Sequence, residues 1–199
     1  MKRRTPAALA VLGACVLGLL PAPARAETAF RTLDSRHALL LGLGFYMALN
    51  ERSAGGFKLF GSYNYAFDRH WALDVQLNVG LAQEGCVKSP DKGFVCTGFG
   101  RGQSVDGVLG VIFKWSLPRS PRAQLHVRGG ALVGGRFVLD QSGLALGGRV
   151  AAGARYYLAP SFALGGEVGT NMGATIFSTA PDVAFFATVD LLVGLEWRL

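Results

Sequence analysis

Hydrophobic residues recur at every second position over most of this chain. Read back from the C-terminus, the alternation runs unbroken from Leu199 to Val183, with Asp190, Glu196 and other mainly polar or small residues between. A period of two is the pattern of a β-strand with one apolar and one polar face. The segment is longer than the five or six residues of an average strand, and suits a tilted strand with about 9–11 residues inside a bilayer.

The same alternation predicts eight strands separated by turn-rich segments. The expected strands are 39–49, 57–67, 71–82, 104–115, 122–134, 144–158, 162–173 and 183–199. The breaks between them alternate in length, and the longest, 83–103, contains both downstream cysteines. An even number of strands, with longer loops at one end and shorter turns at the other, is typical of transmembrane barrels. We therefore expect an all-β, eight-stranded antiparallel up-and-down transmembrane β-barrel.

Large aromatic residues give a second pattern, because they gather beside the short turns and near the end of the last strand. In an eight-stranded barrel they meet at one rim, as an aromatic girdle at a membrane interface requires. The predicted interface aromatics are Phe67, Trp71, Trp115, Tyr156, Phe162 and Trp197.

The polar face carries many glycines and nearly all the strand charges. A water-soluble eight-stranded barrel would turn its apolar face inward instead. Glycine suits the crowded interior of an eight-stranded barrel, which is only wide enough for side chains to fill it. Charges in such an interior must pair, because an unpaired buried charge is strongly unfavourable. The predicted lumen charge network is Lys58, Asp74, Asp106, Lys114, Arg122, Arg128, Arg149, Arg155, Glu167, Asp190, Glu196 and Arg198.

The N-terminus has the three parts of a secretory signal peptide. Lys2, Arg3 and Arg4 precede an apolar stretch, and Ala24-Arg25-Ala26 is an A-x-A cleavage site. The expected divisions are a signal peptide at 1–26, a short periplasmic lead-in at 27–36 and the barrel domain at 37–199. Lipidation at Cys15 is the alternative to cleavage after Ala26. The signal holds four of the twenty basic residues and no acidic one, so the formal charge of +7 is no argument for a nucleic-acid partner.

Two cysteines remain after the signal. Cys86 and Cys96 lie in the long break 83–103. An even number of cysteines in an exported protein predicts a disulfide between them.

The signal, the eight strands, the loop asymmetry and the terminal Leu-Glu-Trp-Arg-Leu resemble small outer-membrane barrels of the OmpA/OmpX/OmpW type. The segments 67–71 and 156–161 are similar to periplasmic turns of that group, although Leu199 stands where the group usually has Phe or Trp. The resemblance implies location in the outer membrane of a Gram-negative bacterium and a porin-family barrel without a cofactor. It also implies contacts with outer-membrane lipid and lipopolysaccharide, insertion by the barrel-assembly machinery through the last strand, and a monomer.

Candidate chemistry is sparse. Some barrels of this type deacylate lipid A with a His-x-Ser pair, but two residues after His126 stands Arg128 and not Ser, and His126 is expected to face the lumen. No Ser/His/acid set, phosphate-binding loop or metal-ligand spacing is apparent, so we expect no enzymatic activity. Lys88, Lys92 and Arg101 make the cysteine-containing segment mildly basic and suited to lipopolysaccharide phosphates. We expect a structural or surface-interaction role, with a lipid A-modifying enzyme or a narrow gated channel as alternatives.

Overall fold

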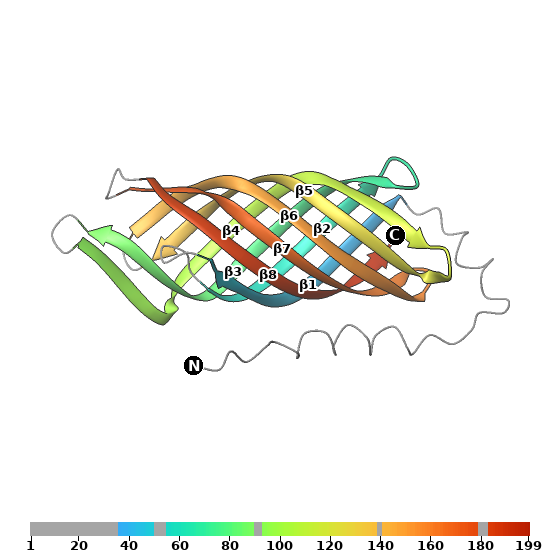
Figure 1. Cartoon of the computed structure of the whole chain (residues 1–199), viewed down its shortest axis with the longest axis horizontal. Coiled ribbons are helices and arrows are strands. Elements are labelled where there is room, and N and C mark those ends of the chain that lie inside the picture. Colours follow the sequence, from blue (N-terminus) through green and yellow to red (C-terminus); the bar gives the residue numbers. More distant parts are fainter. Residues whose placement is uncertain (1–35, 50–54, 90–92, 139–140, 179–182) are drawn as a thin grey trace, which may run out of the picture.

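The fold is a closed barrel of eight antiparallel strands connected up and down in sequence order (Figure 1). The computed structural model describes residues 36–49, 55–89, 93–138, 141–178 and 183–199, without the side chains of 82–101 and 138. The predicted signal peptide, 1–26, and all of the lead-in except Arg36 lie outside these residues. The strands are β1 His37–Ala48, β2 Gly56–Ala66, β3 Trp71–Ser89, β4 Gly93–Leu117, β5 Ser120–Val138, β6 Gln141–Ala159, β7 Phe162–Phe177 and β8 Val183–Arg198. The prediction of eight antiparallel strands is confirmed.

The barrel closes where β8 pairs with β1. The ladder runs from Ala38 opposite Arg198 to Ala48 opposite Thr188, with Leu39 facing Trp197. Closure pairs both edge strands, so neither offers a row of unpaired backbone groups. The last strand of the sequence therefore completes the sheet.

The expectation of a long break at 83–103 is wrong. β3 continues to Ser89 and β4 begins at Gly93, and the two pair again after register shifts around Gln83. The alternation of hydrophobic and polar residues disappears in this part of the chain. Backbone pairing alone extends the hairpin there, and such pairing does not require an apolar face. The strand prediction, which rested on apolar periodicity, missed this part.

The difference between the two ends comes mainly from strand length. The short-turn end, as we name it, has the turns 67–70, 118–119 and 160–161 and the C-terminal end of β8. At the opposite, hairpin end, β5 and β6 are separated only by 139–140, so the predicted loop 135–143 is mostly strand. Figure 1 shows the β3–β4 hairpin, in green, projecting from this end.

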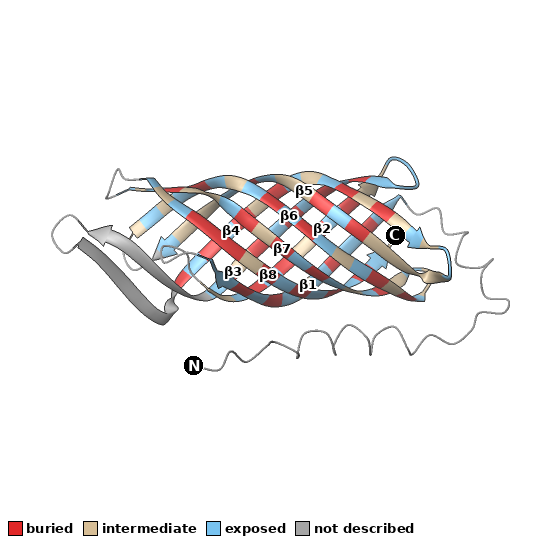
Figure 2. Ribbon diagram, in the orientation of Figure 1, coloured by how far each residue is buried: buried red, intermediate tan, exposed pale blue. Residues whose placement is uncertain are grey.

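Residues alternate between outward apolar and inward polar positions around the barrel. Leu43 and Val150 are 53% and 58% exposed, whereas Arg149 is 1% exposed and Asp190 is fully buried. Figure 2 shows this alternation as a chequered pattern of buried and exposed positions. A protein folded in water has the opposite arrangement, because apolar burial is its main driving force. In the described part of the chain, no helix is long and apolar enough to span a membrane.

Two small apolar clusters interrupt the polar lumen. Leu40, Phe60 and Leu192 form one, while Val108, Leu132, Ala145 and Phe186 form the other. Glycines in the neighbouring strand make room for the first cluster. A Cβ at Gly42 would lie 2.5 Å from the ring of Phe60, and one at Gly44 would lie 2.7 Å from Leu192. The inward glycines therefore allow the narrow interior to hold large side chains.

Candidate functional site: the charged lumen

All the residues of the predicted lumen network lie on the inward face. Arg122 and Arg198 are half-buried near the short-turn end, and the others are buried. The structure gathers most of them into connected groups along the barrel axis. The strand alternation sets their direction, and the register of the sheet sets which of them meet.

Asp190 is the centre of one group. Its Oδ2 accepts hydrogen bonds from Lys58 Nζ at 2.7 Å, from Asn171 Nδ2 at 2.9 Å and from Arg149 Nη1. Asn171 also donates to Thr188 Oγ1 at 3.0 Å. The carboxylate is fully buried, and two cations balance the loss of its hydration.

Glu167 is the centre of a second group. Its carboxylate lies 2.7 Å from Arg149 Nη2, 2.8 Å from Arg128 Nε and 3.2 Å from His126 Nε2. Arg149 thus connects Glu167 with Asp190, and Arg128 extends the group to Asp74 at 3.2 Å. Buried carboxylates and guanidinium groups alternate through the middle of the lumen.

Side chains from opposite walls meet between this group and the short-turn end. Arg155 on β6 donates from Nη2 to Asn64 Oδ1 on β2 at 3.3 Å, four strands away around the ring. Asn64 and Ser62 also donate to Asp74 Oδ1 at 2.7 and 2.5 Å. Such contacts fill the cross-section, as expected for an eight-stranded barrel.

A separate pair lies near the hairpin end. Arg136 pairs with Asp106, and its guanidinium lies 5.1 Å from the centre of the Phe186 ring. The sequence prediction placed Arg136 in a loop and omitted it. Its position could have predicted this contact. Arg136 lies two residues after Gly134, which faces the lumen, and residues two apart on a strand share a face.

Several cations surround one carboxylate near the short-turn end. Glu196 pairs with Arg155, lies 3.5 Å from Arg198 Nε, and accepts a hydrogen bond from Tyr157 Oη at 3.1 Å. The guanidinium of Arg198 also lies 4.0 Å from the centre of the Tyr157 ring. The Tyr157 hydroxyl, which has one proton, also lies 3.0 Å from Gln124 Oε1, an alternative acceptor.

The only strand histidine inside the barrel, among the described residues, belongs to the charge network. His126 is 2% exposed and lies beside Glu167, on the face opposite to the outward apolar residues. The described residues contain no group of three or more His, Cys, Asp or Glu able to hold a metal ion. His126 is therefore part of the ion network around Glu167.

The six predicted interface aromatics lie at the short-turn end, with several in ring contact. Trp71 and Trp115 flank Phe113, at centroid distances of 5.0 and 5.6 Å. Phe162 lies 5.5 Å from Trp197 on the neighbouring strand. Phe113 was absent from the predicted set, although its outward parity matches that of Trp115.

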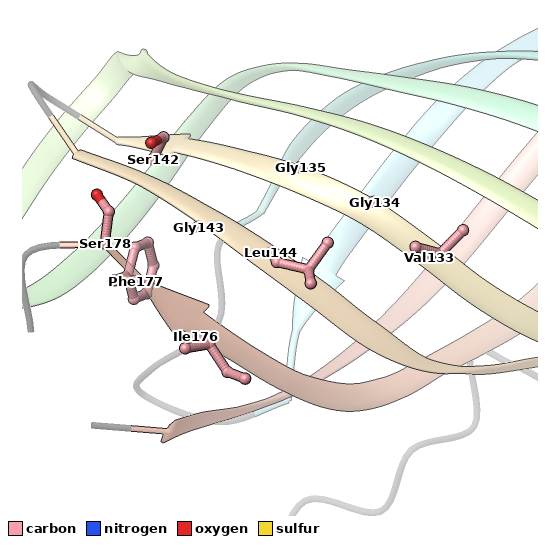
Figure 3. A pocket seen from close by; sticks show the side chains of 9 residues that line it. All are labelled: Val133, Gly134, Gly135, Ser142, Gly143, Leu144, Ile176, Phe177 and Ser178. Atoms are coloured by element: carbon pink, nitrogen blue, oxygen red, sulfur yellow. The ribbon is translucent and has the colours of Figure 1, made fainter. Parts of the chain in front are cut away.

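The outer face has a shallow hollow of about 500 Å³ near the hairpin end. Figure 3 shows its walls on β5, β6 and β7, with apolar Val133, Leu144 and Ile176 along its floor and Ser142 and Ser178 at one end. The backbone N–H of Ser178 donates to the carbonyl of Ser142 at 2.9 Å. No local sequence pattern indicated this hollow, because it depends on three strands lying side by side.

Cys86 and Cys96 are opposite each other in the β3–β4 ladder. Directly paired antiparallel positions have Cα separations within the range that a disulfide spans. Their side chains lie outside the described part of the structure, so the disulfide stays a prediction. The side chains of Lys88, Lys92 and Arg101 are also outside it.

The closed ring of eight strands is the fold of small bacterial outer-membrane β-barrels. One similar solved structure is Neisserial surface protein A, with a TM-score of 0.58, 15% identity, and coverage of 83% of this chain and 98% of that one. Another is the outer membrane protein OprG from Pseudomonas aeruginosa, with a TM-score of 0.57, 12% identity, and coverage of 83% and 97%. No protein-family model and no curated protein sequence matches the chain. At these identities the likeness defines the fold.

Proposed function

We propose that this chain is an integral outer-membrane β-barrel protein with a filled polar lumen and a structural or surface-interaction role. The observation that carries the proposal is the inverted polarity of the barrel. Apolar side chains such as Leu43, Val150 and Leu109 cover the outside, at 53%, 58% and 60% exposure, while the charges are inside. Lipid is the solvent that makes both arrangements favourable, because the hydrocarbon accepts the outer face and the ion pairs satisfy the inner one.

The orientation follows from the aromatic girdle and the turns. The proposal places the short-turn end, with Trp71 and Trp197, at the periplasmic interface and the β3–β4 hairpin outside the cell. Export through the predicted signal at 1–26 and insertion through β8 complete the proposed route. We propose that the protein acts as a monomer.

Heat-modifiable gel migration of the outer-membrane fraction tests this location. The unboiled protein should migrate as a compact species and shift on boiling. Recovery in the soluble periplasm, or an unboiled sample that does not shift, would contradict the proposal.

A pair of variants makes this test sharper. Leu43→Arg places a charge in the middle of β1 on the outer face, where it should cost about 2–4 kcal/mol in a bilayer and deplete the compact species. Leu49→Arg is the matched control, because Leu49 follows the end of β1 and is 59% exposed. Near the interface the same change should cost about 0–1 kcal/mol. Equal tolerance of both variants would indicate a barrel folded in water.

A filled lumen should also prevent conduction. In planar bilayers we expect no steady current from the native protein, because contacts such as that between Arg155 and Asn64 cross the lumen. Arg155→Ser is the comparison variant, since it removes one of the side chains that reach across the lumen, and any current it gains over the native protein measures the contribution of that side chain to the seal. Stable ion conductance by the native protein would favour the gated-channel alternative.

Outer-membrane lipid is the proposed partner of the outer face. The hollow beside Val133, Leu144 and Ile176 opens on the same apolar surface and could accommodate an acyl chain of the outer leaflet. The basic residues of the β3–β4 segment, Lys88 and Lys92, suit lipopolysaccharide phosphates. Lipid A mass spectrometry with and without the protein separates such binding from the enzymatic alternative, because only an enzyme changes the lipid mass.

A further inference from the structure

The positive charge of the lumen is unevenly distributed. Through the middle and the hairpin end, four described cations meet four carboxylates. These eight residues are Lys58, Arg128, Arg136 and Arg149 with Asp74, Asp106, Glu167 and Asp190. This part of the lumen is electrically balanced.

The balance fails near the short-turn end. There Lys114, Arg155 and Arg198 surround a single carboxylate, Glu196. Arg122, also near this end, has contacts of its own and is left out of the comparison. Among these four residues the positive charges exceed the negative charge by two, in a region where burial strengthens electrostatic interactions. Arg155 also interacts electrostatically with Glu167 and Asp74 of the balanced part.

Lys114 has the least compensation. It is 9% exposed, and its ammonium makes no hydrogen bond or ion pair within the described ranges. Its electrostatic neighbours include Arg155, Glu196 and Arg198. Its ammonium nitrogen is not among the fully buried unpaired atoms of the described residues, so it reaches accessible space in the lumen.

Arg155 has unused donor capacity in the same group. It is 2% exposed, and its buried Nε has no hydrogen-bond partner in the described structure. Nη1 and Nη2 are directed to Glu196 and Asn64 respectively. Lys114 and Arg155 are thus two inward cations with donors available for an anion.

The inward residues beside the cations at this end are small. Ala38, Ala72 and Ala163 are buried inward positions at the second residue of β1, β3 and β7, the strands next to β8, β4 and β6. Their side chains occupy less of the lumen at this end than larger residues would. Arg198, with a side chain 20% exposed, lies between this level and the solvent at the short-turn end.

We propose that the short-turn mouth of the lumen binds a phosphate-type anion between Lys114, Arg155 and Arg198. A phosphate group offers several strong acceptor oxygens and carries the negative charge that this end lacks. Glu196 holds Arg155 and Arg198 in place and leaves Lys114 for the anion. This inference goes beyond the proposed function and does not depend on the membrane in which the barrel resides.

An NMR titration with inorganic phosphate tests the site. The barrel is held in a maltoside detergent, which contains no phosphate, and sodium chloride keeps the ionic strength constant. Saturable shifts of the amide resonances of Lys114, Arg155, Glu196 and Arg198 are expected. The absence of saturation, or shifts spread evenly over exposed cations, would overturn the proposal.

Two substitutions separate a built site from general attraction. Lys114→Met should weaken phosphate binding about tenfold, because a charge-assisted contact is lost. Arg119→Gln removes an exposed cation from the turn 118–119 at the same end, and should change the affinity less than about twofold. Equal losses in the two variants, or no loss in Lys114→Met, would contradict the site.

A stability measurement tests the site independently of NMR. It is needed because Lys114→Met alone can change the amide chemical shifts through a local structural change. Without phosphate, Lys114→Met should raise the urea midpoint, because it removes an uncompensated buried charge. Phosphate should raise the midpoint of the native protein but not of the variant, since a ligand stabilises only the state that binds it. A lower midpoint for Lys114→Met without phosphate would show that the ammonium is already satisfied.

The phosphate could be free in solution or belong to a lipid headgroup. Addition of short-chain phosphatidylglycerol to the micelles distinguishes these sources. Displacement of inorganic phosphate identifies a headgroup ligand, while unchanged phosphate binding identifies a soluble phosphate compound. Both outcomes support the phosphate site, and failure of both ligands to bind removes it.

Discussion

The imidazole of His126 lies over the backbone of Gly153, where an added Cβ would be 2.7 Å from the ring Cε1. Gly153 is paired with His126 on one side and with Glu167 on the other. The ring therefore crosses the intervening strand to place Nε2 3.2 Å from Glu167 Oε2. One inward glycine makes this contact between alternate strands possible.

Gly153→Ala should destabilise the barrel. The new Cβ would lie 2.3 Å from the carbonyl oxygen of Gly166 as well as against His126, so the backbone itself must shift. Overpacking of this kind costs about 1–3 kcal/mol, measurable as a lower urea midpoint in micelles. Gly148→Ala on the outer face of the same strand is the control, because its nearest contact is an ordinary 3.6 Å. Equal stability of the two variants would show that the lumen is not crowded at Gly153.

Asp190→Asn should be strongly destabilising, because Lys58 loses its carboxylate partner and Arg149 retains Glu167 as its one paired carboxylate among the described residues. Breaking a buried ion pair from one side costs about 3–5 kcal/mol. Adding Lys58→Met should recover part of that loss, because the stranded ammonium is removed. Urea unfolding of Asp190→Asn, Lys58→Met and the double variant gives the coupling free energy between Lys58 and Asp190. Simple additivity would mean that Lys58 and Asp190 do not interact energetically.

The turn 67–70 should loosen at low pH. Asp68 Oδ1 accepts hydrogen bonds from the backbone N–H groups of His70 at 2.5 Å and Trp71 at 2.8 Å, and these bonds lower the pKa of the exposed carboxyl. Because the folded-state pKa is the lower one, the contribution is present above the ordinary aspartate pKa of about 3.9 and is lost as the pH falls through the folded-state value. An NMR titration of the His70 and Trp71 amides should show a pH midpoint at this lowered pKa of Asp68. Asp68→Asn should abolish it, and a midpoint at or above the ordinary value would contradict the turn geometry.

Cys86 and Cys96 should form a disulfide in protein isolated from the cell envelope. Their direct pairing in the β3–β4 ladder gives a suitable backbone separation. Peptide mass spectrometry after alkylation, with and without prior reduction, measures the bond. Recovery of both residues as alkylated thiols without reduction would contradict the prediction. Cys86→Ser should leave Cys96 alkylated under both conditions.

Much of the barrel was predictable because strand periodicity is a local property. Alternation assigned residues such as Arg149, Glu167 and Asp190 to the inward face, and the structure places them there. It failed at 83–103, where a hairpin continues without an apolar face. Arg136 was missed for the same reason, since it lies beyond the part of β5 that alternates clearly.

The partners within the lumen were not predictable from the alternation. Arg155 reaches Asn64 from a strand four positions away, and Arg149 joins Glu167 to Asp190. These contacts depend on ring closure and on the stagger between strands, which no local pattern contains. The total charge of the inward face was readable, but its excess beside Lys114 was not.

The sequence by itself determined the eight strands, the direction of their side chains and the gathering of aromatics near the short turns. A period of two and the positions of turn residues are sufficient for these features. Only the tertiary structure decided that Asp190 has two cations, that His126 lies over Gly153, and that Lys114 has no ion partner in the described lumen. The physical reason is that a side chain's direction is set by its own strand, whereas its neighbours across a barrel are set by the closure and register of all eight.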